Sequence, residues 1–250
     1  MTIPHVFVEG NTEIIILEKL KLTRPTAVRR NPGGKPFVVD INKRMIDALG
    51  PSLGVEPIRC LVMRDLDSHG GETVDGIRSG VEQALRRMFD ERGFASQNVS
   101  LIAHDRHDNV CAFQAAGPNI KVALHIATYC CLSHFIKSTV DDYVLNLALR
   151  YGTVESFIQE NRSRNWNIGA ETLLNEVRRE IPALLQRNGI PQLREARDYA
   201  RLYAAVLQMD TSPPVFAERT MAHARESDIQ EVFAPLLAAA QFLSDDPVTS

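Results

Sequence analysis

The chain has 250 residues, of which 44% are apolar, and its formal net charge is −3. This size suits one large domain, or one domain with a helical extension, and the charge is not that of a strongly basic nucleic-acid binder. The longest apolar runs are only strand-sized and no signal-peptide pattern opens the chain, so we expect a cytoplasmic protein without a membrane partner.

The first half of the chain alternates short apolar runs with segments of helical periodicity. This alternation predicts an α/β fold with a mostly parallel, doubly wound sheet flanked by helices. Asn11 or Thr12 is the predicted N-cap of the first helix. The predicted strands are 5–8, 36–39, 58–63, 99–103, 110–113 and 120–126, the last two as an edge hairpin, and the predicted helices are 14–20, 41–49 and 74–93.

Beyond about Thr128 the periodicity becomes helical throughout. Pro182 predicts a kink or break, and Asp141-Asp142 predicts an N-terminal cap. We therefore expect two regions, an α/β domain over 1–128 and a helical region over 129–250 that packs on it. The predicted helices of this half are 141–150, 171–187, 195–208, 215–223 and 228–243.

Three carboxylates stand at the ends of two predicted strands. Glu9 follows the first strand, and Asp65 and Asp67 follow the strand at 58–63. Functional groups of a parallel sheet gather just beyond the carboxyl ends of its strands. Two acids one residue apart can reach the same ion where the backbone turns, and Mg²⁺ prefers oxygen ligands of this kind. The pattern predicts a divalent-metal site for phosphoryl-transfer chemistry.

The segment Val8-Glu9-Gly10-Asn11-Thr12-Glu13, followed one strand–helix unit later by Asp65-Leu66-Asp67, resembles the Toprim domain, which is defined by an E-G turn and a D-x-D pair. The resemblance covers roughly residues 4 to 105. It implies that Glu9 acts as general acid or base or as a metal ligand, and that Asp65 and Asp67 bind Mg²⁺ or Mn²⁺. Glu13 matches a further acid of several members and is a fourth candidate ligand.

Within the Toprim families, this chain lacks the tyrosine-bearing machinery of topoisomerases and the accessory modules of primases. It is similar to small nuclease components of phage-defence systems. The resemblance thus implies a metal-dependent nuclease acting on DNA or RNA, the effector of a phage-defence or toxin-like system beside an ATPase sensor protein. Assembly into a homo-oligomer stays open.

Further residues are candidates for substrate binding at the same edge. Arg64 and His69 flank the aspartates and could contact phosphate, and Asp105 follows the strand at 99–103. Two other functions stay open. One is a non-catalytic, regulatory Toprim module held in a complex with an ATPase. The other is a haloacid-dehalogenase-type phosphatase with Asp65 as nucleophile, although that family carries its D-x-D on the first strand.

Overall fold

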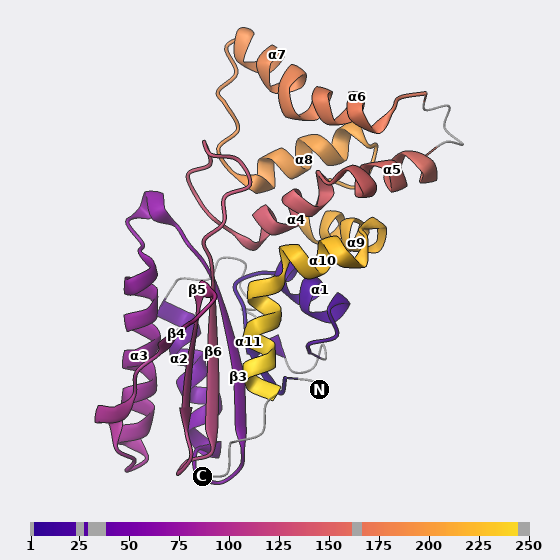
Figure 1. Ribbon diagram of the computed structural model, residues 1–250. Coiled ribbons are helices and arrows are strands. Elements are labelled where there is room, and N and C mark those ends of the chain that lie inside the picture. Colours follow the sequence, from indigo (N-terminus) through magenta and orange to yellow (C-terminus); the bar gives the residue numbers. More distant parts are fainter. Residues whose placement is uncertain (1–2, 24–27, 30–38, 162–166, 245–250) are drawn as a thin grey trace. The chain divides into compact units, whose positions relative to one another are not determined.

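The computed structural model describes residues 3–23, 28–29, 39–161 and 167–244, drawn in colour in Figure 1. The chain forms two units. One runs to Thr128 and resumes at Ala234, and the other runs from Tyr129 to Phe233. The predicted division after residue 128 therefore coincides with a boundary between units, but the last helix belongs with the first unit and not with a helical region over 129–250. None of the helices in the described residues combines the length and hydropathy needed to cross a bilayer.

The first unit is built on a six-stranded sheet in the order β2-β1-β3-β6-β5-β4. The strands β2, β1, β3 and β6 are parallel, whereas β5 runs antiparallel to both β6 and β4. The sheet is thus mixed and mostly parallel, and the predicted α/β class is confirmed. The strands are β1 (His5–Phe7), β2 (Val28–Arg29), β3 (Ile58–Asp65), β4 (Ile102–His104), β5 (His107–Ala115) and β6 (Ile120–Ala127).

The β6 strand corrects the predicted edge hairpin. It does form a hairpin with β5, but it lies inside the sheet and pairs along its whole length with β3, from Ile58 opposite Ile120 to Asp65 opposite Ala127. Every residue of β6 is buried. A nearly continuous apolar strand is most stable where both faces are covered, and this explains its central position. The short strand β4 forms the edge instead.

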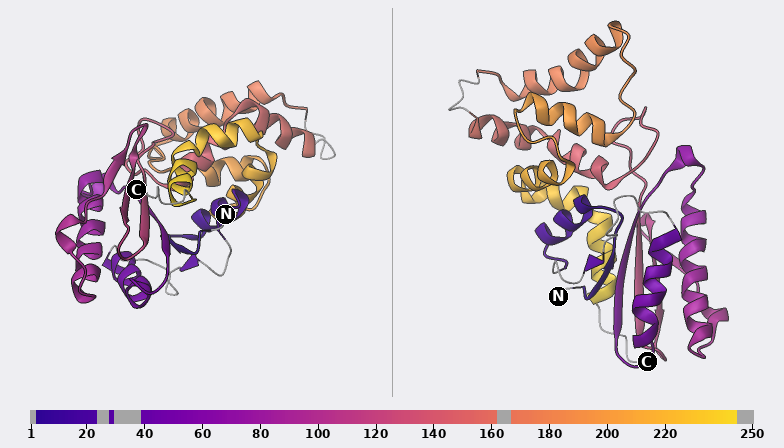
Figure 2. Two further views of the ribbon diagram at one scale, coloured as in Figure 1. Left: turned by 60° about the horizontal axis from the view of Figure 1, so that its bottom comes forward. Right: turned by 180° about the vertical axis from the view of Figure 1, so that it is seen from behind.

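Helices cover both faces of this sheet (Figures 1 and 2). The helices α2 (Val39–Leu49) and α3 (Val74–Glu91) lie on one face, where they and the sheet enclose the main hydrophobic core. The helices α1 (Asn11–Lys19) and α11 (Ala234–Ser244) lie on the other face. The side chain of Lys121, on β6, donates to the carbonyl of Phe242 (3.3 Å) and lies over its ring. This cation anchors the carboxyl end of α11, where the helix dipole favours positive charge.

Two local predictions in this unit have different outcomes. The N-cap of α1 is Gly10, and Asn11 and Thr12 lie inside the helix, so the predicted N-cap at Asn11 or Thr12 is wrong. The predicted strand at 36–39 falls on residues 36–38, outside the described part of the chain, and on Val39, which begins α2.

The second unit is helical, as predicted, around buried aromatic side chains that include Phe157, Tyr199 and Tyr203. The predicted helix at 171–187 is interrupted by a π-helical turn at Glu176–Glu180, just before Pro182. The helix α5 was not predicted. The helices are α4 (Val140–Ala148), α5 (Tyr151–Glu160), α6 (Ala170–Asn175), α7 (Ile181–Arg187), α8 (Ala196–Val206), α9 (Pro213–His223) and α10 (Glu226–Val232).

The predicted cap at Asp141-Asp142 is confirmed at Asp142. Its carboxylate accepts the backbone N–H groups of Thr139 and Cys131, each at 2.9 Å, and so caps the start of α4. The carboxylate is fully buried, and burial raises the pKa of Asp142 to about 6 although these hydrogen bonds oppose the rise.

Candidate functional site

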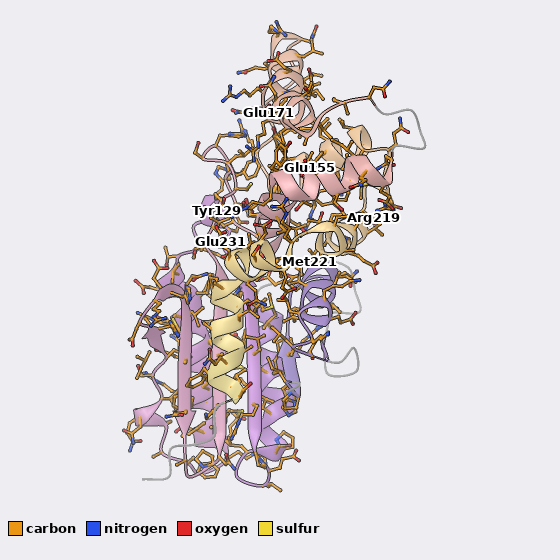
Figure 3. All side chains as sticks on the ribbon, turned by 45° about the vertical axis from the view of Figure 1, so that its right-hand side comes forward. Tyr129, Glu155, Glu171, Arg219, Met221 and Glu231 are labelled. Carbon is orange, nitrogen blue, oxygen red and sulfur yellow. The ribbon has the colours of Figure 1, made fainter. Side chains whose placement is uncertain are left out.

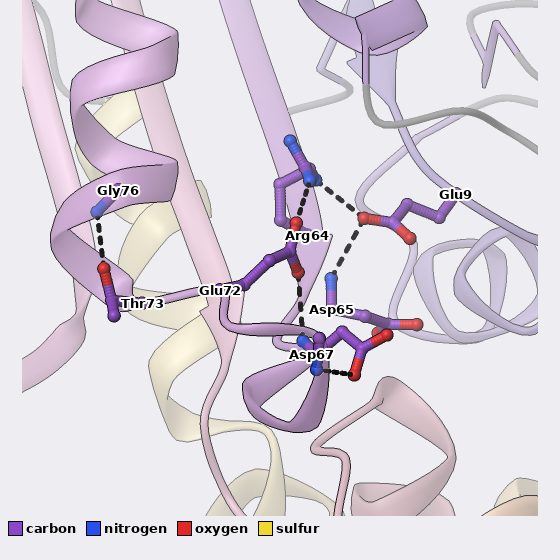
Figure 4. Close-up of polar contacts among 8 residues, drawn as sticks. Glu9, Arg64, Asp65, Asp67, Glu72, Thr73 and Gly76 are labelled. Carbon is purple, nitrogen blue, oxygen red and sulfur yellow. Dashed lines mark hydrogen bonds and ion pairs between the residues drawn. The ribbon is translucent and has the colours of Figure 1, made fainter.

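The site lies where β1 and β3 end. These strands are parallel neighbours, with Phe7 opposite Val62, so their carboxyl ends meet at the same edge of the sheet. Glu9 follows β1, and Asp65 is the last residue of β3. The backbone N–H of Asp65 donates to Glu9 Oε1 at 3.3 Å, as Figure 4 shows. The structure therefore brings together the residues of the two motifs, which lie more than fifty positions apart in the chain.

A buried arginine joins two of the carboxylates of this site. The Arg64 Nε donates to Glu9 Oε1 at 2.7 Å, and its terminal nitrogen donates to Glu72 Oε1 at 3.3 Å (Figure 4). The Arg64 side chain is only 2% exposed, against 20% for Glu9 and 23% for Glu72. The guanidinium that we expected to contact substrate phosphate points instead into the cluster, where it offsets the charge of two acids.

The alternation of β3 explains this direction. Side chains two residues apart in a strand share a face, and Cys60 and Val62 belong to the core beneath α2 and α3. Arg64 is two residues beyond Val62, so its side chain lies on the same face of the sheet as Cys60 and Val62 and is buried. Asp65 comes next in the alternation and is half-buried.

Asp67 lies in the turn that follows β3. Its Oδ1 accepts the backbone N–H of Gly70 at 3.0 Å, and its own N–H donates to Glu72 Oε2 at 3.0 Å. A Cβ on Gly70 would lie 3.1 Å from Asp67 Cγ, so glycine permits the close approach of this turn. Glu72 thus connects Arg64 to the Asp67 turn.

Sequence reasoning did not single out Glu72. The available signal was its place directly after Ser68-His69-Gly70-Gly71, since a carboxylate after such a tight turn can fold back to the backbone that precedes the turn.

The remaining predicted residues lie at different distances from this cluster. Glu13, in the first turn of α1, is only 4% exposed, and its Oε2 lies 3.0 Å from the position of a Cβ on Gly10. His69 is exposed on the Asp67 turn. Asp105 is exposed in the turn between β4 and β5, two to three strands from β3, or roughly 10–14 Å at the usual strand spacing. Asp105 is therefore not part of the cluster.

The predicted set of metal ligands, Glu9, Glu13, Asp65 and Asp67, stays a prediction. Within the residues that the structure describes, no three acidic, histidine or cysteine side chains form a group that could hold a metal ion. The reason is visible in the contacts, because Arg64 engages Glu9 and the Gly70 backbone engages Asp67. Glu9 and Asp67 each keep one oxygen, Oε2 and Oδ2, that accepts no hydrogen bond from the described residues. Open carboxylate oxygens fit a hard divalent ion that takes one or two protein ligands.

No protein-family model, curated protein or solved structure matches this chain. The similarity to Toprim domains therefore depends on the E-G and D-x-D residues and on the order of the elements that carry them.

The strand beside β3 carries a buried histidine behind the site. His125 on β6 is the register partner of Met63 and is only 2% exposed. Burial, and to a smaller extent the nearby His107, lowers the pKa of His125 to about 4. His125 is therefore neutral at pH 7 and adds no positive charge to the cluster.

Proposed function

We propose that this protein is a Toprim-type, metal-dependent nuclease that cleaves phosphodiester bonds of DNA or RNA. The observation that carries the proposal is the meeting of Glu9 with the end of β3, which puts the acid of the E-G turn beside the D-x-D pair. A role as effector of a phage-defence or toxin-like system, beside an ATPase sensor, extends the proposal on the basis of the family resemblance alone.

Asp65 and Asp67 would hold a Mg²⁺ or Mn²⁺ ion, with Glu9 or Glu13 as further candidates. The bound ion would act as a Lewis acid on the phosphate. Glu9 is the group suited to move a proton, because two donors fix its Oε1 and leave Oε2 open. It would take a proton from the attacking water or give one to the leaving oxygen as the P–O bond breaks. Arg64 positions Glu9, and His69 is the exposed group available to the substrate.

The test uses purified protein with plasmid, single-stranded DNA and structured RNA, in Mg²⁺ or Mn²⁺. The expected result is cleavage that falls about a hundredfold or more in Glu9→Gln and in Asp67→Asn, the scale of lost general acid–base or metal catalysis. The matched control is Asp105→Asn, since Asp105 is an exposed acid in the turn between β4 and β5, two to three strands from β3. The proposal fails if Glu9→Gln and Asp67→Asn cleave as fast as the control.

One observation favours a second candidate, a regulatory Toprim module without catalysis. The Arg64 guanidinium already contacts both Glu9 and Glu72, so these carboxylates have a compensating charge without a metal ion. Co-purification with an ATPase is expected of either candidate. Only the nuclease should cleave after release from that complex, and only the nuclease should lose this cleavage in Asp67→Asn.

A further inference from the structure

A cavity in the helical unit combines two arginines with apolar walls. Its volume is about 200 Å³. Two hydrogen bonds connect segments next to the cavity. The backbone N–H of Ile136 donates to the carbonyl of Arg194 at 3.0 Å, and the hydroxyl of Tyr199 donates to the carbonyl of Val177 at 2.5 Å. The polar residues that line the cavity are His134, Arg178, Arg179, Gln186, Gln192 and Tyr199.

The π-helical turn Glu176–Glu180 supplies both arginines. Proline has no N–H, so Pro182 cannot donate to the carbonyl of Arg178 four residues earlier, and a regular α-helical bond is missing at this point. The chain accommodates this with wider π-type bonding between α6 and α7. Such turns occur often at functional sites, because they displace side chains from the regular helical positions.

The cavity has no carboxylate among its lining residues, although Glu176 and Glu180 belong to the same π-helical turn as the two arginines. Arg178 donates to the carbonyl of Leu149 at 2.9 Å, but neither Arg178 nor Arg179 has an ion pair within the described part of the chain. Five other arginines of this unit have acidic partners, some of which are labelled in Figure 3, whereas Arg187 and Arg194 form no ion pair within the described residues. The pairs are Arg150 with Glu231, Arg197 with Asp141, Arg201 with Asp198, Arg219 with Glu160, and Arg225 with Glu155.

We propose that this cavity binds a phosphate monoester. Guanidinium groups bind phosphate oxygens with paired, charge-assisted hydrogen bonds, and two arginines match the double charge of the monoester. Pro182, Leu185 and Leu193 give an apolar wall for the organic part of the ester. The volume of about 200 Å³ is smaller than the roughly 300–1,000 Å³ of typical ligand pockets, so the cavity suits the phosphate end of a larger molecule whose remaining part lies outside it. The ligand would be a free mononucleotide or the 5′-phosphate end of a nucleic acid strand.

The experiment measures binding to the full-length protein in EDTA, with the Asp67→Asn substitution throughout, so its result does not depend on the proposed nuclease. The probes are AMP, with adenosine as its control, and a 5′-phosphorylated single-stranded oligonucleotide, with the 5′-hydroxyl strand as its control. The test variant is Arg179→Gln, because Arg179 is exposed and makes no ion pair that the fold would lose. The control variant is Arg187→Gln, an exposed arginine of α7 outside the cavity.

We expect AMP or the 5′-phosphorylated strand to bind, and the unphosphorylated controls to bind much more weakly. Arg179→Gln should weaken phosphate-dependent binding about tenfold, as the loss of one charge-assisted contact predicts, while Arg187→Gln should not. Binding of AMP alone identifies a free nucleotide as the ligand, and binding of the strand alone identifies a nucleic acid end. Two outcomes overturn the proposal: no phosphate-dependent binding at millimolar AMP or micromolar strand, or equal effects of Arg179→Gln and Arg187→Gln.

Discussion

Removing the Arg64 charge tests whether this guanidinium holds the carboxylate cluster together. In Arg64→Gln, Glu9 and Glu72 would lose the cation that both contact. Two carboxylates that share one guanidinium repel each other by roughly 3 kcal/mol at an effective dielectric constant of about 20. Breaking a buried ion pair costs about 3–5 kcal/mol, and the partial exposure of both acids favours the lower end. We therefore expect the first unit to lose about 3 kcal/mol of stability.

Hydrogen exchange measured by mass spectrometry suits this prediction, because it reports the opening of β1 and β3 separately from the helical unit. The control is Arg59→Gln, which removes an arginine from the other end of β3, where it contacts Asn119. The double variant Arg64→Gln with Glu72→Gln should recover part of the lost protection, since it removes the repulsion. Millimolar Mg²⁺ should protect Arg64→Gln more than the parent, because a cation can then replace the guanidinium.

The reasoning is refuted if Arg64→Gln exchanges no faster than Arg59→Gln, or if the double variant is no better protected than Arg64→Gln alone. Either result would mean that Arg64 carries no compensating role.

Three further predictions concern the Asp67 turn and the two groups with shifted pKa values. Gly70→Ala should lower cleavage about tenfold or more, because the added Cβ would press on the Asp67 carboxylate. The free energy of unfolding in urea should fall by less than about 1 kcal/mol, and unchanged cleavage would contradict the prediction. The pKa of His125 is lowered to about 4, so the unfolded state binds more protons below pH 6.5. Stability of the first unit should fall by up to about 3 kcal/mol from pH 6.5 to 4, and His125→Gln should flatten this dependence in exchange measurements. The pKa of Asp142 is raised to about 6, so its contribution has the opposite sign. The stability that Asp142 contributes to the helical unit is fully present below about pH 3.8 and is lost as the pH rises through 6. In Asp142→Asn, the protection of this unit from hydrogen exchange should no longer change over this pH range, and a remaining change would contradict the assignment.

Local patterns determined much of the first unit. Alternation, apolar runs and turn residues identified the strands at 5–8 and 58–63, and they placed Glu9 and Asp65 at strand ends. These features depend on residues close together in the chain, where periodicity and turn chemistry act directly. The pairing of β1 with β3, with Phe7 opposite Val62, was decided by the sheet, and it brings Glu9 to the backbone of Asp65.

Other features depended on pairing across the sheet. The same local pattern suits a hairpin at an edge or in the centre, and only the partner strand β3 places β6 inside the sheet. Likewise, the periodicity of residues 228–243 predicts one helix, whereas the structure ends α10 at Val232 and assigns α11 to the sheet unit.

The sequence by itself determined the α/β class and the acidic residues that follow β1 and end β3. The tertiary structure alone decided that Arg64 turns inward to contact Glu9 and Glu72, and that Asp67 is held by its own turn. The physical reason is that a charged side chain takes its direction from the partners it can reach. Those partners come from other strands and turns, so no local pattern in the chain specifies them.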